Sequence, residues 1–171
     1  MKIFLVGYMA SGKSRLGKEL SELTGYPSID LDDIFEERYR ISVNDFFKKY
    51  DEISFRQLEQ ELLLETESQP NAMVSTGGGT PCFFRNMEFM KINGVSIYLR
   101  VSARILAERL MNVKRKRPLL EKVEPGEMET MVRKHLDERE PFYLQADHIL
   151  EAQNVDPEFI MKLIPELPRL L

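Results

Sequence analysis

A loop able to bind phosphate lies near the start of the chain, at residues 7–14. Its sequence, GYMASGKS, satisfies the pattern G-x-x-x-x-G-K-[ST] at every defined position. Glycines in such a loop let successive backbone N–H groups point into one concavity, where the positive end of the following helix also attracts phosphate. Lys13 is expected to reach the β- and γ-phosphates of a nucleotide, and the Ser14 hydroxyl to bind Mg²⁺. These residues therefore predict the binding of a nucleoside triphosphate.

Three carboxylates, Asp30, Asp32 and Asp33, come next along the chain. We predict a short strand over residues 26–33 that ends in these acids, and open α/β sheets bind ligands at the carboxyl ends of their strands. Asp30 and Asp32 would project to the same side of that strand. They can orient Mg²⁺-bound water or accept a proton from a substrate hydroxyl. The alternative is that one acid caps the next helix, and we assign that role mainly to Asp33 and a functional role to Asp32.

Three consecutive glycines, Gly77, Gly78 and Gly79, follow a predicted strand over residues 72–75. Many phosphate-loop NTPases end this strand with an acid that holds Mg²⁺, and here Ser75 and the glycines stand instead. A simple turn does not need three glycines, because each costs backbone entropy on folding. We therefore expect a backbone platform against the transferred phosphate and its acceptor. Cys82, just beyond, has no motif partner and is interpreted as a bystander.

A basic run at residues 114–117 (KRKR) precedes Pro118. Such a run is usually a solvated face and occasionally a nucleic-acid patch. Next to a phosphate loop a third interpretation gains weight, a mobile lid that brings positive charge over the γ-phosphate and excludes water from it. Arg117, held by the following proline, is the best candidate within this run.

Three further residues are ambiguous by pattern alone. Arg56 lies among the apolar positions of a predicted helix, where an arginine is usually a surface residue whose stem packs on apolar groups. Arg139 lies just before Pro141, where we expect its helix to end. His135 falls on the apolar stripe of the same helix. We interpret it as a core-edge residue, since no second His or Cys stands at metal-ligand spacing.

The strands and helices that must position these residues alternate along the chain. Short apolar runs predict strands over residues 3–6, 26–33, 72–75, 95–99 and 147–150. Helices are predicted between these strands from the spacing of apolar residues and from start and stop signals. In chain order, the signals are the apolar residues Leu16, Leu20 and Leu23 before a stop at Gly25; the apolar residues Ile34, Phe35 and Tyr39; a capping box at Ser42; the inward-facing residues Ile53, Phe55, Leu58 and Leu62; an N-cap at Ser102 before Leu106 and Leu110; the apolar stripe of residues 127–140; and an N-cap at Asp156 followed by Pro157. This alternation implies an α/β fold with a parallel sheet covered on both faces.

The composition is that of an ordinary globular domain of 171 residues, with 43% hydrophobic and 30% charged residues. A net charge of −4 argues against nucleic acid as the main partner. The single cysteine cannot form an internal disulfide, which favours a reducing compartment. No apolar run has membrane-spanning length, and Met1 leads directly into a strand. We therefore expect a cytoplasmic protein with no membrane partner.

In their order, these landmarks resemble the shikimate kinase family over nearly the whole chain. The matching segments are residues 7–14, 29–32 (IDLD), 55–56 (FR), 75–79 (STGGG), 117–120 (RPLL) and 139–143 (REPFY). The resemblance implies one domain over residues 1–171, a three-layer α/β sandwich with a five-stranded parallel sheet. This is the fold of the nucleoside monophosphate kinases among the P-loop NTP hydrolases. It also implies a helical substrate-binding region near residues 33–62 and a lid near residues 112–124.

The activity implied by the resemblance is transfer of the γ-phosphate of ATP to the 3-hydroxyl of shikimate, with Mg²⁺, in the pathway to chorismate and aromatic amino acids. The enzyme would be a monomer. The implied ATP-binding residues are Ala10, Ser11, Gly12, Lys13, Ser14, Arg15, Arg117 and Asn154. The implied shikimate-binding residues are Asp32, Arg56, Gly77, Gly78, Gly79 and Arg139. Ser14 would bind the metal, with Asp30 acting through water.

The resemblance also assigns catalytic roles to Lys13, Asp32 and Arg117, with Asp32 as the candidate base. This agrees with residue chemistry, because two arginines can hold a carboxylate while an aspartate addresses the hydroxyls opposite. One position departs from the family, which usually has an arginine stacked on adenine seven residues before Arg117. Here that position is Leu110, with Arg109 beside it. Either Arg109 reaches over, or adenine packs on an aliphatic side chain.

Two other classes of function remain open from the residues themselves. One is a kinase of the same architecture that acts on another small hydroxy acid, such as gluconate, or on a nucleotide. A nucleotide acceptor would need a base-recognition pocket that we do not identify. The other is a nucleotide-dependent switch or assembly ATPase, a class that normally carries the acid missing after the third strand.

Overall fold

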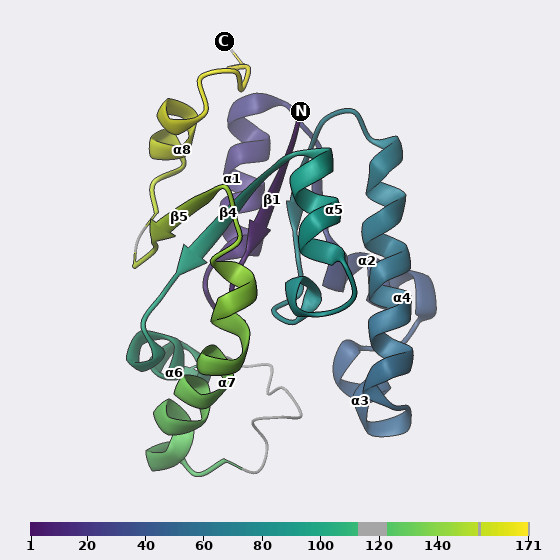
Figure 1. Cartoon of the computed structure of the whole chain (residues 1–171), viewed down its shortest axis with the longest axis vertical. Helices are drawn as coiled ribbons and strands as arrows, with labels where there is room; N and C mark the ends of the chain where they lie inside the picture. Colours follow the sequence, from purple (N-terminus) through teal and green to yellow (C-terminus); the bar gives the residue numbers. More distant parts are fainter. Residues whose placement is uncertain (113–122, 154, 171) are drawn as a thin grey trace.

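The protein, seen here as a computed structural model that describes residues 1–112, 123–153 and 155–170, is built around a parallel sheet (Figure 1). The strands of the described residues are β1 (Lys2–Val6), β2 (Ser28–Asp30), β3 (Ala72–Ser75), β4 (Val95–Arg100) and β5 (His148–Glu151). They lie in the order β2-β3-β1-β4-β5, and every neighbouring pair is parallel. The predicted five-stranded α/β fold is confirmed.

Helices cover both faces of this sheet, as the apolar run of β1 predicts. The helices are α1 (Lys13–Thr24), α2 (Leu31–Tyr39), α3 (Val43–Lys49), α4 (Glu52–Glu65), α5 (Asn86–Asn93), α6 (Ala103–Asn112), α7 (Met128–Tyr143) and α8 (Pro157–Leu163), with short 3₁₀ turns η1 (Thr66–Ser68), η2 (Thr80–Cys82) and η4 (Pro125–Glu127). Phe4 of β1 packs edge-on against Phe89 of α5, with ring centroids 6.5 Å apart. The next residue, Leu5, lies on the opposite face beside Gly17 of α1. Successive strand residues therefore supply two separate helical layers.

The segment from α2 to α4 forms a helical cluster beside the sheet, at the right of Figure 1. Its interior is aromatic. The ring of Phe35 lies 5.3 Å from that of Phe46 and 4.9 Å from that of Phe55, measured between centroids. Ile53, predicted to face inward, is 68% exposed instead, because Phe55 and Leu62 carry the buried face of α4. This cluster occupies the region predicted near residues 33–62.

Strand β2 ends at Asp30 and not at residue 33, which changes the roles of its acids. Asp30 is the N-cap of α2, and its carboxylate accepts the backbone N–H groups of Asp32 at 3.0 Å and Asp33 at 3.4 Å. The prediction that Asp33 is the cap is wrong, as is the prediction that Asp30 and Asp32 project from one strand. The physical reason is that an extended aspartate satisfies the free N–H groups of a helix start. Asp32 belongs to the first turn of α2.

Helix α7 continues through Pro141 to Tyr143, although we expected it to end before the proline. Tyr143 is completely buried, and its hydroxyl donates to the carbonyl oxygen of Gly78. This packing holds the last turn against the core and offsets the backbone hydrogen bond that proline cannot make. Helix α5 was not predicted. No helix in the described ranges is long and apolar enough to span a bilayer.

Candidate active site

The phosphate loop connects β1 to α1, as the motif predicts, and it needs glycine at two points. Gly7 has φ of 141°, and a Cβ there would lie 2.8 Å from the carbonyl oxygen of Leu99. Gly12 has φ of 101° where α1 begins. Both values favour glycine, since other residues are strained at positive φ. The backbone can therefore form a tight loop, with a concave inner side, just before α1 begins.

The side chain of Lys13 lies against this loop and is almost completely buried. Its Nζ donates to the carbonyl oxygens of Gly7 and Tyr8, at 2.8 Å each. These carbonyls solvate the ammonium group. A phosphate entering the concavity would meet a positive charge already in place.

A pocket of about 240 Å³ opens over the loop. Its lining residues are Met9, Ala10, Gly12, Lys13, Ser14, Arg15, Asp30, Asp32, Thr76 and Gly78. Ser14 Oγ donates to Asp30 Oδ2 at 2.5 Å, so two oxygen ligands of the kind that Mg²⁺ prefers lie together. In the part of the chain that the structure describes, no three His, Cys, Asp or Glu side chains form a metal cluster. A metal here would therefore rely on phosphate and water for its other ligands.

A second pocket, of about 230 Å³, adjoins the first. Its lining residues are Met9, Asp32, Val43, Phe47, Phe55, Arg56, Glu59, Gly77, Gly78, Gly79 and Arg139. Met9, Asp32 and Gly78 line both pockets. Asp32 thus lies where a group in the second pocket would face a phosphate in the first.

Arg56 points into the protein and not toward solvent, with 6% of its surface exposed. Its Nη1 donates to Glu59 Oε2 at 2.8 Å, while Nη2 and Nε donate to Glu52 Oε1 at 3.1 and 3.3 Å. Burial acts to lower its pKa, but Glu59 and Glu52 raise the pKa above its usual value. The contacts with described residues leave one N–H on each terminal nitrogen for a ligand. The guanidinium therefore retains N–H donors that a further carboxylate could accept.

Glu59, which sequence reasoning missed, is 2% exposed and lies between Arg56 and Thr80. Its Oε1 accepts a hydrogen bond from Thr80 Oγ1 at 2.6 Å. Burial raises the pKa of Glu59, and the hydrogen bonds from Arg56 and Thr80 oppose that rise. The spacing of Glu52, Arg56 and Glu59, four and three residues apart on one helix, was the available signal.

A Cβ would overlap neighbouring groups at two of the three glycines after β3 and would make a tight contact at the third. A Cβ on Gly77 would lie 2.4 Å from Glu59 Oε1, and one on Gly79 would lie 2.4 Å from Arg56 Nη2. A Cβ on Gly78 would lie 3.1 Å from the backbone nitrogen of Met9. The loop therefore packs directly on the Arg56–Glu59 pair and on the phosphate loop. This close approach is the physical reason for the glycine run.

Arg139 reaches the second pocket from α7 and is half-buried. Its guanidinium carbon lies 5.5 Å from the ring centroid of Tyr8, a distance suited to a cation–π contact. His135, one turn earlier, is half-buried as expected for a core-edge residue, and its Nδ1 lies 2.8 Å from the Tyr8 hydroxyl.

Burial is the main cause that raises the pKa of Cys82 to about 11, so this thiol stays protonated at neutral pH.

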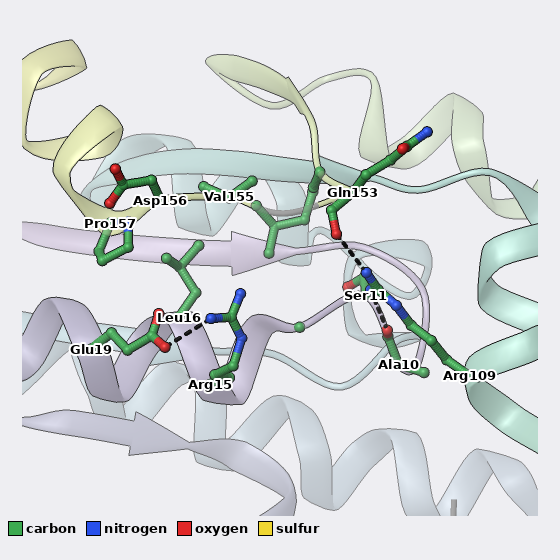
Figure 2. Close-up of a pocket in the computed structure, with 13 residues that line it drawn as sticks. Ala10, Ser11, Arg15, Leu16, Glu19, Arg109, Gln153, Val155, Asp156 and Pro157 are labelled. Atoms are coloured by element: carbon green, nitrogen blue, oxygen red, sulfur yellow. Dashed lines mark hydrogen bonds and ion pairs between the residues drawn. The ribbon is translucent and has the colours of Figure 1, made fainter. Parts of the chain in front are cut away.

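A third pocket, of about 640 Å³, lies on the other side of the phosphate loop (Figure 2). It is lined by residues of the loop and α1, by Leu99 and Arg109, and by Ala152, Gln153, Val155, Asp156 and Pro157. Arg109 donates from Nη1 to the Ala10 carbonyl at 3.0 Å and from Nη2 to the Gln153 carbonyl at 2.7 Å. Leu110 is buried in the core and does not line this pocket. Arg109 and not Leu110 therefore lines the third pocket, and the contact with adenine stays a prediction.

The three pockets together gather the predicted site residues that the structure describes. Arg15, predicted to bind ATP, lines the two pockets beside the loop and pairs with Glu19 at 2.8 Å (Figure 2). Arg117, Asn154 and residues 113–122 of the predicted lid lie outside the described residues.

Shikimate kinases are similar to this chain in sequence and in structure. The sequence model described as "Shikimate kinase" matches residues 9–167. A shikimate kinase of Parabacteroides distasonis is 42% identical over 154 residues, which are 90% of this chain and 89% of the relative. The crystal structure of shikimate kinase from Bacteroides thetaiotaomicron has a TM-score of 0.90 at 36% identity and covers 96% of this chain and 98% of its own. Shikimate kinase from Acinetobacter baumannii in complex with shikimate has a TM-score of 0.84 at 31% identity, over 97% and 91% of the two chains.

Proposed function

This chain belongs to the shikimate kinase family and transfers phosphate from ATP to a hydroxyl of shikimate in aromatic biosynthesis, and we propose that its adjoining pockets hold the two substrates of that reaction. The observation that carries this assignment is the shared wall of Met9, Asp32 and Gly78 between the phosphate pocket and the second pocket. Phosphoryl transfer needs the acceptor oxygen in line with the γ-phosphate, and this wall is where the two would meet.

The acceptor occupies the pocket of about 230 Å³. Arg56 offers its unused N–H groups to the shikimate carboxylate, and Arg139 lines the same pocket and adds a second positive charge. Phe47, Phe55 and Val43 supply apolar surface for the carbon ring. Two arginines beside an apolar wall suit a small cyclic acid.

Asp32 acts as the base. It lines both pockets, so its carboxylate can accept the proton of the attacking hydroxyl while the oxygen forms its bond to the γ-phosphorus. The bond that breaks joins that phosphorus to the oxygen that leaves with ADP. The role of Asp32 thus depends on the first turn of α2, which Asp30 caps.

Lys13 and the loop N–H groups bind the phosphates. When ATP enters, the ammonium group exchanges the carbonyls of Gly7 and Tyr8 for phosphate oxygens. Arg117 is assigned to the same phosphates on its sequence position alone, and Arg109, Arg15 and Asn154 to the nucleotide that extends into the third pocket. Arg109, fixed to two backbone carbonyls, offers a planar surface to the base.

Mg²⁺ fits the site because Ser14 and Asp30 supply adjacent oxygen ligands beside the phosphate pocket. Ser14 would bind the ion and Asp30 its water shell. When bound, the ion neutralises charge on the β- and γ-phosphates.

We also propose a monomeric, cytoplasmic enzyme. The single cysteine suits a reducing compartment.

The acceptor assignment is tested by ADP release in the presence of shikimate, gluconate and nucleoside monophosphates. Shikimate should accelerate release far above the rate without acceptor, and the Arg56→Ala and Arg139→Ala variants should need much more shikimate to do so. If both variants responded to shikimate as the wild type does, the carboxylate would bind elsewhere. Release independent of any acceptor would favour a switch or ATPase.

A further inference from the structure

His135, Arg139 and Tyr143 lie four residues apart along α7, so they share one face of the helix. That face looks onto both loops of the active site. One turn before Arg139, His135 contacts the phosphate loop through Tyr8. One turn after it, the Tyr143 hydroxyl donates to the Gly78 carbonyl in the glycine run. Arg139 is thus flanked on both sides by hydrogen bonds from its helix, one to the phosphate loop and one to the glycine run.

Tyr8 is the central residue of this arrangement. It follows Gly7 in the phosphate loop and is 1% exposed. Its hydroxyl lies 2.8 Å from His135 Nδ1, and its ring centroid lies 5.5 Å from the guanidinium carbon of Arg139. Burial and the charge of Arg139 lower the pKa of His135, so the imidazole is neutral at pH 7 and Nδ1 can accept the Tyr8 O–H.

The two arginines of the acceptor pocket are held in different ways. Arg56 is fixed by ion pairs with Glu52 and Glu59. No acid in the described ranges pairs with Arg139, whose guanidinium instead contacts the ring of Tyr8 and hydrogen-bonds to the side chain of Tyr143. A long side chain has many rotamers, and an arginine without an ion pair needs another contact to select one of them.

We propose that Tyr8, held by its hydrogen bond to His135, positions Arg139 for the carboxylate of the acceptor. The ring supplies a surface that the guanidinium contacts, and the hydrogen bond to His135 restrains the ring. A residue of the ATP-binding loop thereby contributes to acceptor affinity. This inference rests on the proposed role of Arg139 in binding the carboxylate.

The test is steady-state kinetics on Tyr8→Phe and His135→Leu, each of which removes the hydrogen bond while Tyr8→Phe keeps the ring. Each should lower kcat/KM for shikimate by about 3- to 10-fold, the range expected for one neutral hydrogen bond, through KM and not kcat. The KM for ATP should change by less than about twofold. The double variant should lose no more than either single variant, because both remove the same bond.

The decisive comparison repeats Tyr8→Phe in an Arg139→Ala background, where kcat/KM can be read from the linear range of shikimate concentration. There the substitution should have no further effect. Tyr98→Phe is a matched control, since it removes a hydroxyl that donates to Glu140 of the same helix at 3.2 Å, away from the acceptor pocket. It should leave the KM for shikimate unchanged even if the unfolding temperature falls.

Three results would overturn the inference: an unchanged shikimate KM in Tyr8→Phe, an equal loss in the Arg139→Ala background, or a rise in the ATP KM as large as that for shikimate. Failure of the underlying assignment looks different. If Arg139→Ala itself left shikimate affinity intact, the role of Arg139 in the carboxylate site would be wrong. If Arg139→Ala weakened binding and Tyr8→Phe did not, only the positioning role would fail.

Discussion

Arg56 and Glu59 form an ion pair of 2.8 Å in which 7% and 3% of the two side chains remain exposed. Two charges this deeply buried are stable only when they are paired and hydrogen-bonded, and Glu59 is satisfied on its other side by Thr80. The glycine run closes over this pair. The pair is therefore both part of the core and the floor of the acceptor pocket.

The Glu59→Gln variant is expected to lose stability, because it leaves the buried Arg56 with only the partly exposed Glu52 as an ionic partner. An amide retains some hydrogen bonding, so the expected loss is roughly 1–3 kcal/mol in the free energy of unfolding. Urea unfolding measures it. Glu88→Gln, which breaks an exposed ion pair with Arg85, is the matched control and should change stability by less than about 0.5 kcal/mol. Equal losses in the two variants would contradict the importance of burial.

The Arg56→Ala and Arg139→Ala variants are each expected to weaken shikimate binding. Each leaves the substrate carboxylate poorly paired in a partly desolvated pocket, at a cost of roughly 2–5 kcal/mol. Since about 1.4 kcal/mol corresponds to a tenfold change, kcat/KM should fall by about 30-fold or more. Titration calorimetry with shikimate and with ATP separates the two sites, and ATP affinity should stay near the wild-type value. Arg85→Ala, at an exposed position outside the pockets, serves as the control.

The Asp32→Asn variant should behave differently from the arginine variants. It keeps the shape of the side chain and some hydrogen bonding but removes the acceptor for the hydroxyl proton. We expect the loss in kcat, by about 10²- to 10⁴-fold, with a much smaller change in shikimate affinity. A variant with near-normal kcat and weakened shikimate binding would make Asp32 a binding residue and not the base.

Gly79→Ala tests the close approach of the glycine run. The added Cβ would lie 2.4 Å from Arg56 Nη2, so either the loop or the guanidinium must move. We expect this overpacking to cost roughly 1–3 kcal/mol in the free energy of the native loop arrangement. Because the guanidinium of Arg56 is displaced, the KM for shikimate should rise while the KM for ATP stays unchanged. Gly126→Ala is the control, because a Cβ there meets nothing within 4 Å. Similar kinetics for the two variants would show that the loop adapts without disturbing Arg56.

Lys13→Ala should nearly abolish turnover in a folded protein, because its charge meets phosphate charge most strongly in the transition state. Removal of Mg²⁺ with a chelator should have a comparably large effect, reversed by added Mg²⁺. Ser14→Ala should raise the Mg²⁺ concentration needed for half-maximal rate. Near-wild-type kcat in Lys13→Ala would show that the loop binds phosphate through its backbone alone.

Local sequence was sufficient for the phosphate loop and for most elements around it. A motif of eight consecutive residues builds its own site, because the loop N–H groups and the helix start come from the same stretch of chain. The starts of α3, α6 and α8 at Ser42, Ser102 and Asp156 were likewise predictable, since a cap bonds to residues two or three positions away. The parallel sheet followed from the alternation of strands and helices.

The acceptor site could not be read from pattern, because its contacts join residues far apart in the chain. By helical pattern alone Arg56 was typical of a surface residue, and its burial depends on Glu59 beneath it and on a glycine run beyond β3. Glu59 itself gave no signal other than its spacing. The ordered resemblance to shikimate kinases pointed to Arg56 and Arg139, but it did not say what holds either of them.

Tertiary structure alone decided which of several neighbouring residues performs each task. Asp32 and not Asp33 lies at the boundary between two pockets. Arg109 and not Leu110 reaches the third pocket. Helix α7 passes Pro141 because Tyr143 is anchored to Gly78. Local conformational preferences of neighbouring residues differ by about 1 kcal/mol or less, except for the strong preference of proline against a helix interior. Contacts between distant segments contribute enough free energy to select one arrangement among them.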